Sequence, residues 1–254
     1  MIRADEQGAD RMRTDVLGVG FDSFTIEQAV SVAYDEILSG GKSYVVTPNP
    51  EIVWQCRKNE ALREALSRAC LVLPDGIGVI IGARILRTPM DHGRIPGIDF
   101  ASALFEKMAG SGKSVFLLGA KPGVAEMAGE KLAERYPGLI ISGTLDGYFT
   151  DDKYVIEKVN EAAPSLLLVC LGAPKQELWM AENIGSLSVP LCAGLGGSLD
   201  VFAGNIKRAP VFFRKLGLEW LYRLMREPRR LKRSMCLPLF LLTVIRKRLR
   251  TRHP

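Results

Sequence analysis

Short apolar runs alternate along the chain with longer stretches whose apolar residues recur at helical spacing. Runs that end in glycine, proline or a polar residue predict buried strands, and the amphipathic stretches predict helices. The expected strands are Val16–Gly20, Ser43–Thr47, Leu71–Leu73, Ser114–Gly119, Leu139–Ser142, Ser165–Leu171 and Val189–Ala193. The expected helices are Thr25–Leu38, Pro50–Ser67, Gly76–Leu86, Gly97–Ala109, a segment reaching Arg135, Asp151–Ala163 and Lys175–Ile184.

This alternation predicts an α/β fold, a Rossmann-like, mostly parallel sheet with helices on both faces. Crossover helices place the carboxyl ends of parallel strands, and the loops that follow them, at one edge of the sheet. We therefore expect the polar and glycine residues after the strands to converge there, at the edge where such folds bind ligands. These residues are Thr47, Asn49, Asp75, Gly119, Gln176 and Asp200.

Asp75 is the first candidate for chemistry, because it follows the apolar run Leu71–Leu73 and precedes a predicted helix. At the rim of a ligand site its carboxylate would serve as a general base. Aspartate is also a common N-cap, so a purely structural role in starting the helix is the alternative.

The pattern changes after residue 209, and so does the charge. The segment Pro210–Pro254 holds 13 of the 34 Lys and Arg residues but only 2 of the 28 Asp and Glu residues. Its net charge is +11, whereas the rest of the chain carries −5. Apolar residues beside basic clusters predict a basic amphipathic helical appendage that lies on an anionic membrane surface. The alternative is a terminal helix docked on its own core. The apolar stretch Met235–Ile245 is too short for a helix that spans a bilayer, which needs about 20 residues.

Several chemistries lack their signatures. The five cysteines form no C-x-x-C pair, and only two histidines, His92 and His253, are present. Neither a P-loop nor a complete G-x-G-x-x-G follows a strand, and no D-x-D pair occurs. We therefore expect no cofactor and no metal.

Glycine-rich turns follow three predicted strands, at Gly119–Gly123, Gly172–Pro174 and Gly194–Gly197. Backbone N–H groups in such turns suit a diphosphate, although glycine after a strand is also ordinary turn chemistry. Gln176 offers an amide that suits a uracil edge or sugar hydroxyls. Arg94 could bind a leaving diphosphate, or it could be an ordinary surface arginine.

Eight motifs occur in an order that resembles the WecG/TagA/CpsF family of bacterial glycosyltransferases. They are Thr47-Pro48-Asn49-Pro50-Glu51, Leu73-Pro74-Asp75-Gly76-Ile77-Gly78, Arg94-x-x-Gly97-x-Asp99, Asp146-Gly147-Tyr148-Phe149, Gly172-Ala173-Pro174-Lys175-Gln176-Glu177, Gly194-x-Gly196-Gly197-Ser198-Leu199-Asp200, Lys207-Arg208-Ala209-Pro210 and Gly217-Leu218-Glu219-Trp220-Leu221-Tyr222-Arg223. The resemblance runs from about Val16 to Arg233; the loop before Arg94 departs from it, with Gly93 where the family often has Glu.

The resemblance implies a metal-independent, inverting transfer from a UDP-sugar donor, commonly UDP-N-acetylmannosamine, to a polyprenyl-diphosphate-linked sugar acceptor in cell-surface polysaccharide biosynthesis. Asp75 would be the base, Thr47 a sugar or acceptor contact, and Arg94 the partner of the departing UDP. Gln176, Tyr148 and Asp200 would line the donor pocket, and the appendage would cover it. The remaining expected substrate-binding residues are Asn49, Gly76, Asp99, Gly119, Gly147, Gly172, Gly196, Gly197 and Arg208; the expected acceptor or membrane residues are Arg223, Arg230 and Arg233.

The expected organisation is a flexible tail (1–13), an α/β glycosyltransferase domain (14–209) and a membrane-associating appendage (210–254). The N-terminus lacks the apolar core of a signal peptide, so we expect a cytoplasmic chain. Together with the resemblance, which implies an acceptor at the inner membrane surface, this gives the expectation of a peripheral protein at the cytoplasmic face of the inner membrane. A homo-oligomer is left open. The alternatives are an NAD(P)-dependent oxidoreductase and a nucleic-acid-binding protein that uses the basic tail; the acidic body argues against the latter, so we expect no nucleic acid partner.

Overall fold

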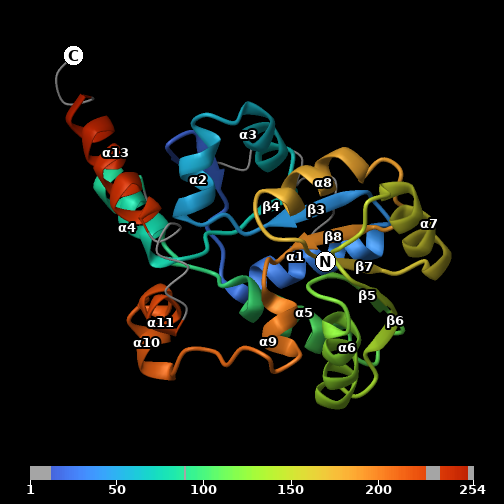
Figure 1. Ribbon diagram of the computed structural model, residues 1–254. Coiled ribbons are helices and arrows are strands. Elements are labelled where there is room, and N and C mark those ends of the chain that lie inside the picture. Colours follow the sequence, from blue (N-terminus) through green and yellow to red (C-terminus); the bar gives the residue numbers. More distant parts are fainter. Residues whose placement is uncertain (1–12, 89, 227–234, 251–254) are drawn as a thin grey trace.

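A computed structural model describes residues 13–88, 90–226 and 235–250. Its centre is a six-stranded sheet in the order β4-β3-β8-β7-β5-β6, and every neighbouring pair is parallel. Helices cover both faces (Figure 1), which confirms the predicted Rossmann-like α/β class. The strands of the sheet are β3 (Ser43–Val46), β4 (Leu71–Val72), β5 (Ser114–Gly119), β6 (Ile140–Leu145), β7 (Leu166–Cys170) and β8 (Leu191–Gly194).

Two hydrophobic cores lie on the two faces of the sheet, because successive side chains of a strand point in opposite directions. In β7, Leu166 and Leu168 belong to one core, and Leu167 and Val169 to the other. The first core is covered by α1 (Ile26–Ser39), α5 (Gly97–Met108), α6 (Val124–Arg135) and α9 (Ser198–Phe202). The second is covered by α2 (Pro50–Cys56), α3 (Glu60–Ser67), α4 (Ile77–Leu86), α7 (Asp152–Ala162), α8 (Lys175–Asn183) and α13 (Cys236–Arg250).

The predicted strand Val16–Gly20 is wrong. A two-residue turn at Leu17 and Gly18, both with positive φ, separates β1 (Thr14–Val16) from β2 (Val19–Phe21) in an antiparallel hairpin. This is the φ pattern that favours two-residue hairpins, but Leu-Gly lacks the usual Asn-Gly signature.

Asp22, directly after this hairpin, covers the exposed edge of β4. Its backbone N–H donates to the carbonyl of Val72 (2.9 Å), and its Oδ2 accepts the N–H of Val72 (2.7 Å). Arg13 anchors the arrangement by an ion pair with Asp22 (3.2 Å) and a hydrogen bond to the carbonyl of Ala69 (2.7 Å). The edge strand that leads to Asp75 is therefore held from outside the sheet.

The predicted helix Pro50–Ser67 is divided into α2 and α3. Asn59 ends the continuous helix and starts the second one, because its side chain accepts the N–H of Leu62 (3.0 Å) as an N-cap. The other predicted helices and strands lie within a few residues of their expected bounds.

The C-terminal segment contains α10 (Val211–Lys215), α11 (Glu219–Arg226) and α13. Figure 1 shows α13 lying against α4. Gly78 and Gly82, one turn apart on α4, allow this close approach: an added Cβ would lie 2.6 Å from Leu237 at Gly78 and 2.8 Å from the ring of Phe240 at Gly82. Phe240 and Val244 are fully buried, so this helix docks on the core as one of our alternatives expected. Within the described ranges, no helix is both long and apolar enough to cross a membrane.

Candidate active site

A cavity of about 770 Å³ opens at the carboxyl edge of the sheet. Each of the six strands contributes to it through the residues that follow its carboxyl end, as the parallel topology requires. The C-terminal segment borders another side through Gly217, which lies between α10 and α11, through Glu219 and Trp220 of α11, and through Leu237 of α13. The cavity is therefore built from the α/β domain and the C-terminal segment together.

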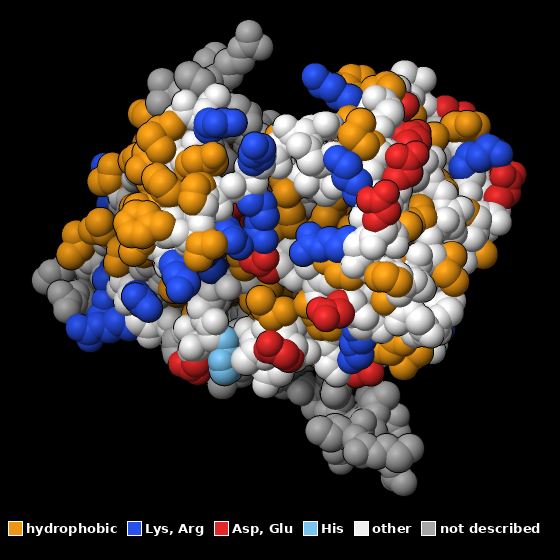
Figure 2. All heavy atoms as spheres, turned by 90° about the horizontal axis from the view of Figure 1, so that it is seen from below, with side chains coloured by type: hydrophobic (Ala, Val, Ile, Leu, Met, Phe, Trp, Pro, Cys, Tyr) orange, Lys and Arg blue, Asp and Glu red, His pale blue; other side chains and the backbone are white. Residues whose placement is uncertain are grey.

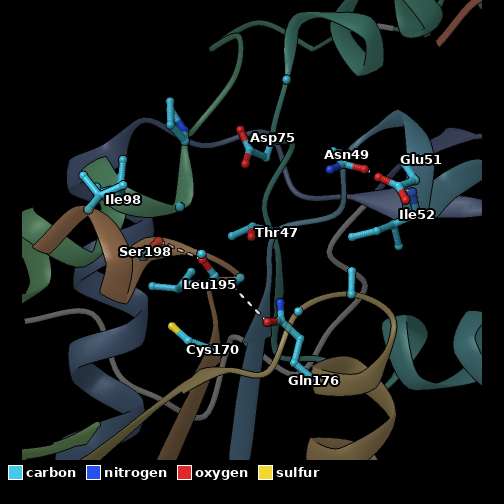
Figure 3. Close-up of a pocket in the computed structure, with 18 of the residues that line it drawn as sticks. Thr47, Asn49, Glu51, Ile52, Asp75, Ile98, Cys170, Gln176, Leu195 and Ser198 are labelled. Atoms are coloured by element: carbon cyan, nitrogen blue, oxygen red, sulfur yellow. Dashed lines mark hydrogen bonds between the residues drawn. The ribbon is translucent and has the colours of Figure 1, made fainter. Parts of the chain in front are cut away.

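Asp75 and Thr47 both line this cavity, and Figure 3 shows the side chain of Asp75 directed into it. The loop around Asp75 is held on both sides, because its N–H donates to the carbonyl of Pro48 (3.3 Å) and the carbonyl of Pro74 accepts the N–H of Ile95 (2.9 Å). Gly76, with φ of 85°, is the N-cap of α4, and no side chain caps that helix. The alternative in which Asp75 serves as the N-cap is therefore wrong.

Thr47 and Gln176 form the floor of the cavity, where both are largely buried. The Thr47 hydroxyl donates to the carbonyl of Gly194 (3.3 Å), and Oε1 of Gln176 accepts the N–H of Gly196 (2.9 Å; Figure 3). Nε2 of Gln176 donates to Oε1 of Glu177 (2.9 Å). Both side chains therefore hold the turn Gly194–Gly197 in place, in addition to any contact that they make with a ligand.

Arg94 lies at the junction of the cavity and the C-terminal segment. One Nη donates to the carbonyl of Arg214 (2.6 Å), and the other lies 3.8 Å from the carboxylate of Glu219. The side chain is about 17% exposed and lines the cavity. Arg94 is thus a partly buried cation held by α10 and α11, and the surface-arginine alternative does not describe it.

Most of the predicted site residues meet at this cavity. Asn49 lines it while its side chain also caps α2, by accepting the N–H of Ile52 (3.1 Å). Tyr148 lines it with 69% of its surface exposed. The predicted residues in the lining are Thr47, Asn49, Asp75, Gly76, Arg94, Gly147, Tyr148, Gly172, Gln176, Gly196, Gly197 and Asp200.

Three predicted site residues lie outside this lining. Asp99 and Arg208 form a bidentate ion pair (2.6 and 3.0 Å), and Arg208 borders a separate cavity of about 320 Å³. Gly119 has φ of 131°, and an added Cβ would collide with the carbonyl of Cys170. Position 119 therefore requires a glycine, because β5 and β7 approach each other closely there. Of the predicted acceptor or membrane residues, Arg230 and Arg233 fall outside the described residues, as does the side chain of Arg223.

The sequence reasoning missed Leu237, which reaches the cavity from α13, and assigned no role to Glu219 and Trp220. A signal for Leu237 was present in Gly78-x-x-x-Gly82, because small residues one turn apart mark a helix face that another helix approaches closely. In the part of the chain that the structure describes, no group of three or more His, Cys, Asp or Glu residues is arranged to hold a metal ion.

A parallel α/β sheet with a large cavity, lined by both polar and apolar groups, at the carboxyl ends of its strands is the architecture of a ligand-binding α/β enzyme. The chain belongs to the glycosyl transferase WecG/TagA/CpsF family, whose model matches residues 14–254. It is therefore a glycosyltransferase, which argues against the oxidoreductase and nucleic-acid-binding alternatives.

Two relatives carry the same name, N-acetylglucosaminyldiphosphoundecaprenol N-acetyl-beta-D-mannosaminyltransferase. The protein of Bacillus spizizenii is 37% identical over 204 residues, which cover 80% of this chain and 79% of the relative. The protein of Staphylococcus aureus strain MW2 is 34% identical over 238 residues, or 93% of each chain.

Proposed function

We propose that this enzyme transfers N-acetylmannosamine, or a related hexose, from a UDP-sugar to a polyprenyl-diphosphate-linked sugar, with inversion and without a metal. The observation that carries the proposal is the common cavity of Asp75, Thr47 and Arg94. The names of the relatives support the transferred sugar and the lipid-linked N-acetylglucosamine acceptor. The pathway would be cell-surface polysaccharide biosynthesis.

The reaction requires an acceptor hydroxyl to lose its proton while the UDP diphosphate leaves the anomeric carbon. The Asp75 carboxylate would accept that proton, a role that typically contributes about 10²- to 10⁴-fold in rate. Arg94 would stabilise the leaving charge, which benefits most from a donor held in place before reaction. The hydrogen bond from Arg94 to the Arg214 carbonyl supplies this fixed position.

The C-terminal segment supports contact with a membrane surface, which we propose is the cytoplasmic face of the inner membrane. Large apolar side chains are exposed along this segment, with Phe212 of α10 at 67%, its C-cap Leu216 at 52% and Trp220 of α11 at 38%. Figure 2, which views the molecule from below, shows hydrophobic side chains gathered on the left of the molecule beside Lys and Arg side chains. Apolar groups bordered by cations suit the interface of an anionic membrane. A lipid-linked acceptor would then enter the cavity along the side that α11 and α13 border.

A direct test measures UDP release from a panel of UDP-sugars, with and without a short-chain polyprenyl-diphosphate N-acetylglucosamine acceptor. We expect acceptor-dependent release from UDP-N-acetylmannosamine that persists in EDTA. Absence of release from every UDP-sugar would refute the proposed donor class. Loss of release in EDTA would refute metal independence alone.

A further inference from the structure

Glu177 is a buried carboxyl group directly beneath the cavity. As a first-turn residue of α8 it could be an exposed partner of the helix dipole, but its side chain has no exposed surface. Burial raises the pKa of this carboxyl group, and its Oε2 has no hydrogen-bond partner within the described residues. Burying such a group costs free energy, which indicates that Glu177 has a role beyond starting the helix.

The role lies in its contact with Gln176. A glutamine amide fits its surroundings in two orientations that differ by exchange of oxygen and NH₂. Because Oε1 of Glu177 accepts from Nε2, the amide oxygen of Gln176 is turned toward the N–H of Gly196. In the opposite orientation an NH₂ group would face that N–H, and the hydrogen bond to Gly196 would be lost. Glu177 and the Gly196 N–H therefore favour the same orientation of Gln176, and removing the Glu177 oxygen removes one of the two contacts that set it.

The orientation of Gln176 matters because the turn Gly194–Gly197 forms part of the cavity lining. At its first residue the turn packs closely against α8, since a Cβ on Gly194 would lie 2.6 Å from Cε of Met180 and 3.2 Å from Nε2 of Gln176. Further along, Gly196 has φ of 56°, and the hydrogen bond from its N–H to Gln176 fixes the backbone there. Releasing that bond frees the wall of the cavity without removing any residue that lines it.

We propose that Glu177 is a positioning residue that sets the shape of the donor site through the Gln176 amide and the Gly196 N–H. The link to the donor rests on the proposed function, whereas the link from Glu177 to Gly196 does not. Two readouts separate them: amide hydrogen exchange at Gly196 and the KM for the UDP-sugar.

The informative variant is Glu177→Met, which keeps a long side chain and removes the acceptor oxygen. We expect exchange at Gly196 to accelerate about five- to tenfold, as for one lost hydrogen bond. We also expect a rise in donor KM with an unchanged acceptor KM. Glu177→Gln retains an acceptor oxygen and should restore both values to within about twofold of wild type. Should the Met variant not fold, Glu177→Ala removes the same oxygen.

Trp179→Phe is the matched control on the same helix. It removes another side-chain hydrogen bond of α8, from Nε1 of Trp179 to Asp152 (2.9 Å). Because that bond points toward α7, exchange at Gly196 and donor KM should not change. Unchanged exchange at Gly196 in the Met variant would overturn the link from Glu177 to Gly196. Equal changes in exchange and donor KM in Trp179→Phe would overturn it as well. Faster exchange at Gly196 with an unchanged donor KM would overturn the role of Glu177 in the donor site. If the wild-type enzyme were inactive with every UDP-sugar, the proposed function would be refuted, but the exchange result would still be valid.

Discussion

The docking of α13 can be disrupted at one residue, Phe240. Its ring is fully buried against Gly82, and Val244 is the other fully buried residue of this helix in the described chain. Burying a Phe or Val side chain contributes about 1.5–3 kcal/mol each, so these two residues supply about 3–6 kcal/mol. A helix of this length is marginally stable by itself in water, so contacts with the body hold α13 in place. The burial of Phe240 and Val244 acts there together with Leu237, which packs against Gly78, and with the ion pair from Lys247 to Asp15 (2.9 Å).

Replacing Phe240 by Ala should cost about 3–5 kcal/mol, because a cavity remains where the ring was. That loss removes most of the free energy that Phe240 and Val244 contribute together, so α13 should separate from the body while the six-stranded sheet stays folded. A loss of about 3 kcal/mol corresponds to about a hundredfold change in an equilibrium. We therefore expect amide exchange in residues 236–250 to accelerate about a hundredfold or more, with little change in β5 and β7.

Leu242→Ala is the control, because Leu242 lies on the same helix and is 50% exposed. Hydrogen exchange followed by mass spectrometry, together with the free energy of unfolding, distinguishes the two variants. If Phe240→Ala left residues 236–250 as protected as in wild type, the packing argument would be refuted. Equal acceleration in Leu242→Ala would refute it as well.

Three further outcomes are expected. Asp75→Asn should retain donor binding and lose at least about tenfold in turnover, measured as UDP release; near-normal turnover would dismiss Asp75 as the base. Phe212→Glu should weaken sedimentation with anionic vesicles by about tenfold or more while leaving the melting temperature unchanged, since this side chain is largely exposed; full sedimentation would contradict a membrane role for α10. Because the pKa of Glu177 is raised in the folded state above its usual 4.5, the unfolded chain releases this proton first, and its contribution to stability falls as pH rises above about 4.5. The free energy of unfolding of wild type minus that of Glu177→Gln should accordingly decrease from pH 4 to pH 7, and a flat difference would contradict the burial argument.

The fold was predictable because strands and helices carry different hydrophobic periods. Residues 166–170 are apolar at every position, which is typical of a parallel strand covered on both faces. The errors arose where one local interaction overrides the pattern. Leu17 adopts a positive φ that apolar periodicity does not register, and Asn59 interrupts an otherwise amphipathic stretch by capping α3.

The candidate site was predictable to the extent that chain topology determines it. Residues of the loops and helix starts that follow parallel strands, such as Asp75 and Gln176, meet at one edge because crossovers leave no other arrangement. Partnerships between distant residues were not predictable in this way. Asp99 and Arg208 were both expected to bind substrate, yet they bind each other across 109 positions of sequence. The burial of Glu177 was missed for the same reason, because a first-turn glutamate looks identical in sequence whether it is exposed or enclosed.

The charge asymmetry of the chain acquires a meaning once the cavity is known. In sequence the basic segment resembles a tail added to a complete enzyme, yet Trp220 and Leu237 line the same cavity as Asp75. Arg94, from the α/β domain, is held by the backbone of Arg214 and lies near Glu219. A contact that alters α10 or α11, such as one with a membrane, must therefore also act on the environment of Arg94. Under the proposed function, this arrangement would couple lipid contact to the residue that receives the leaving diphosphate.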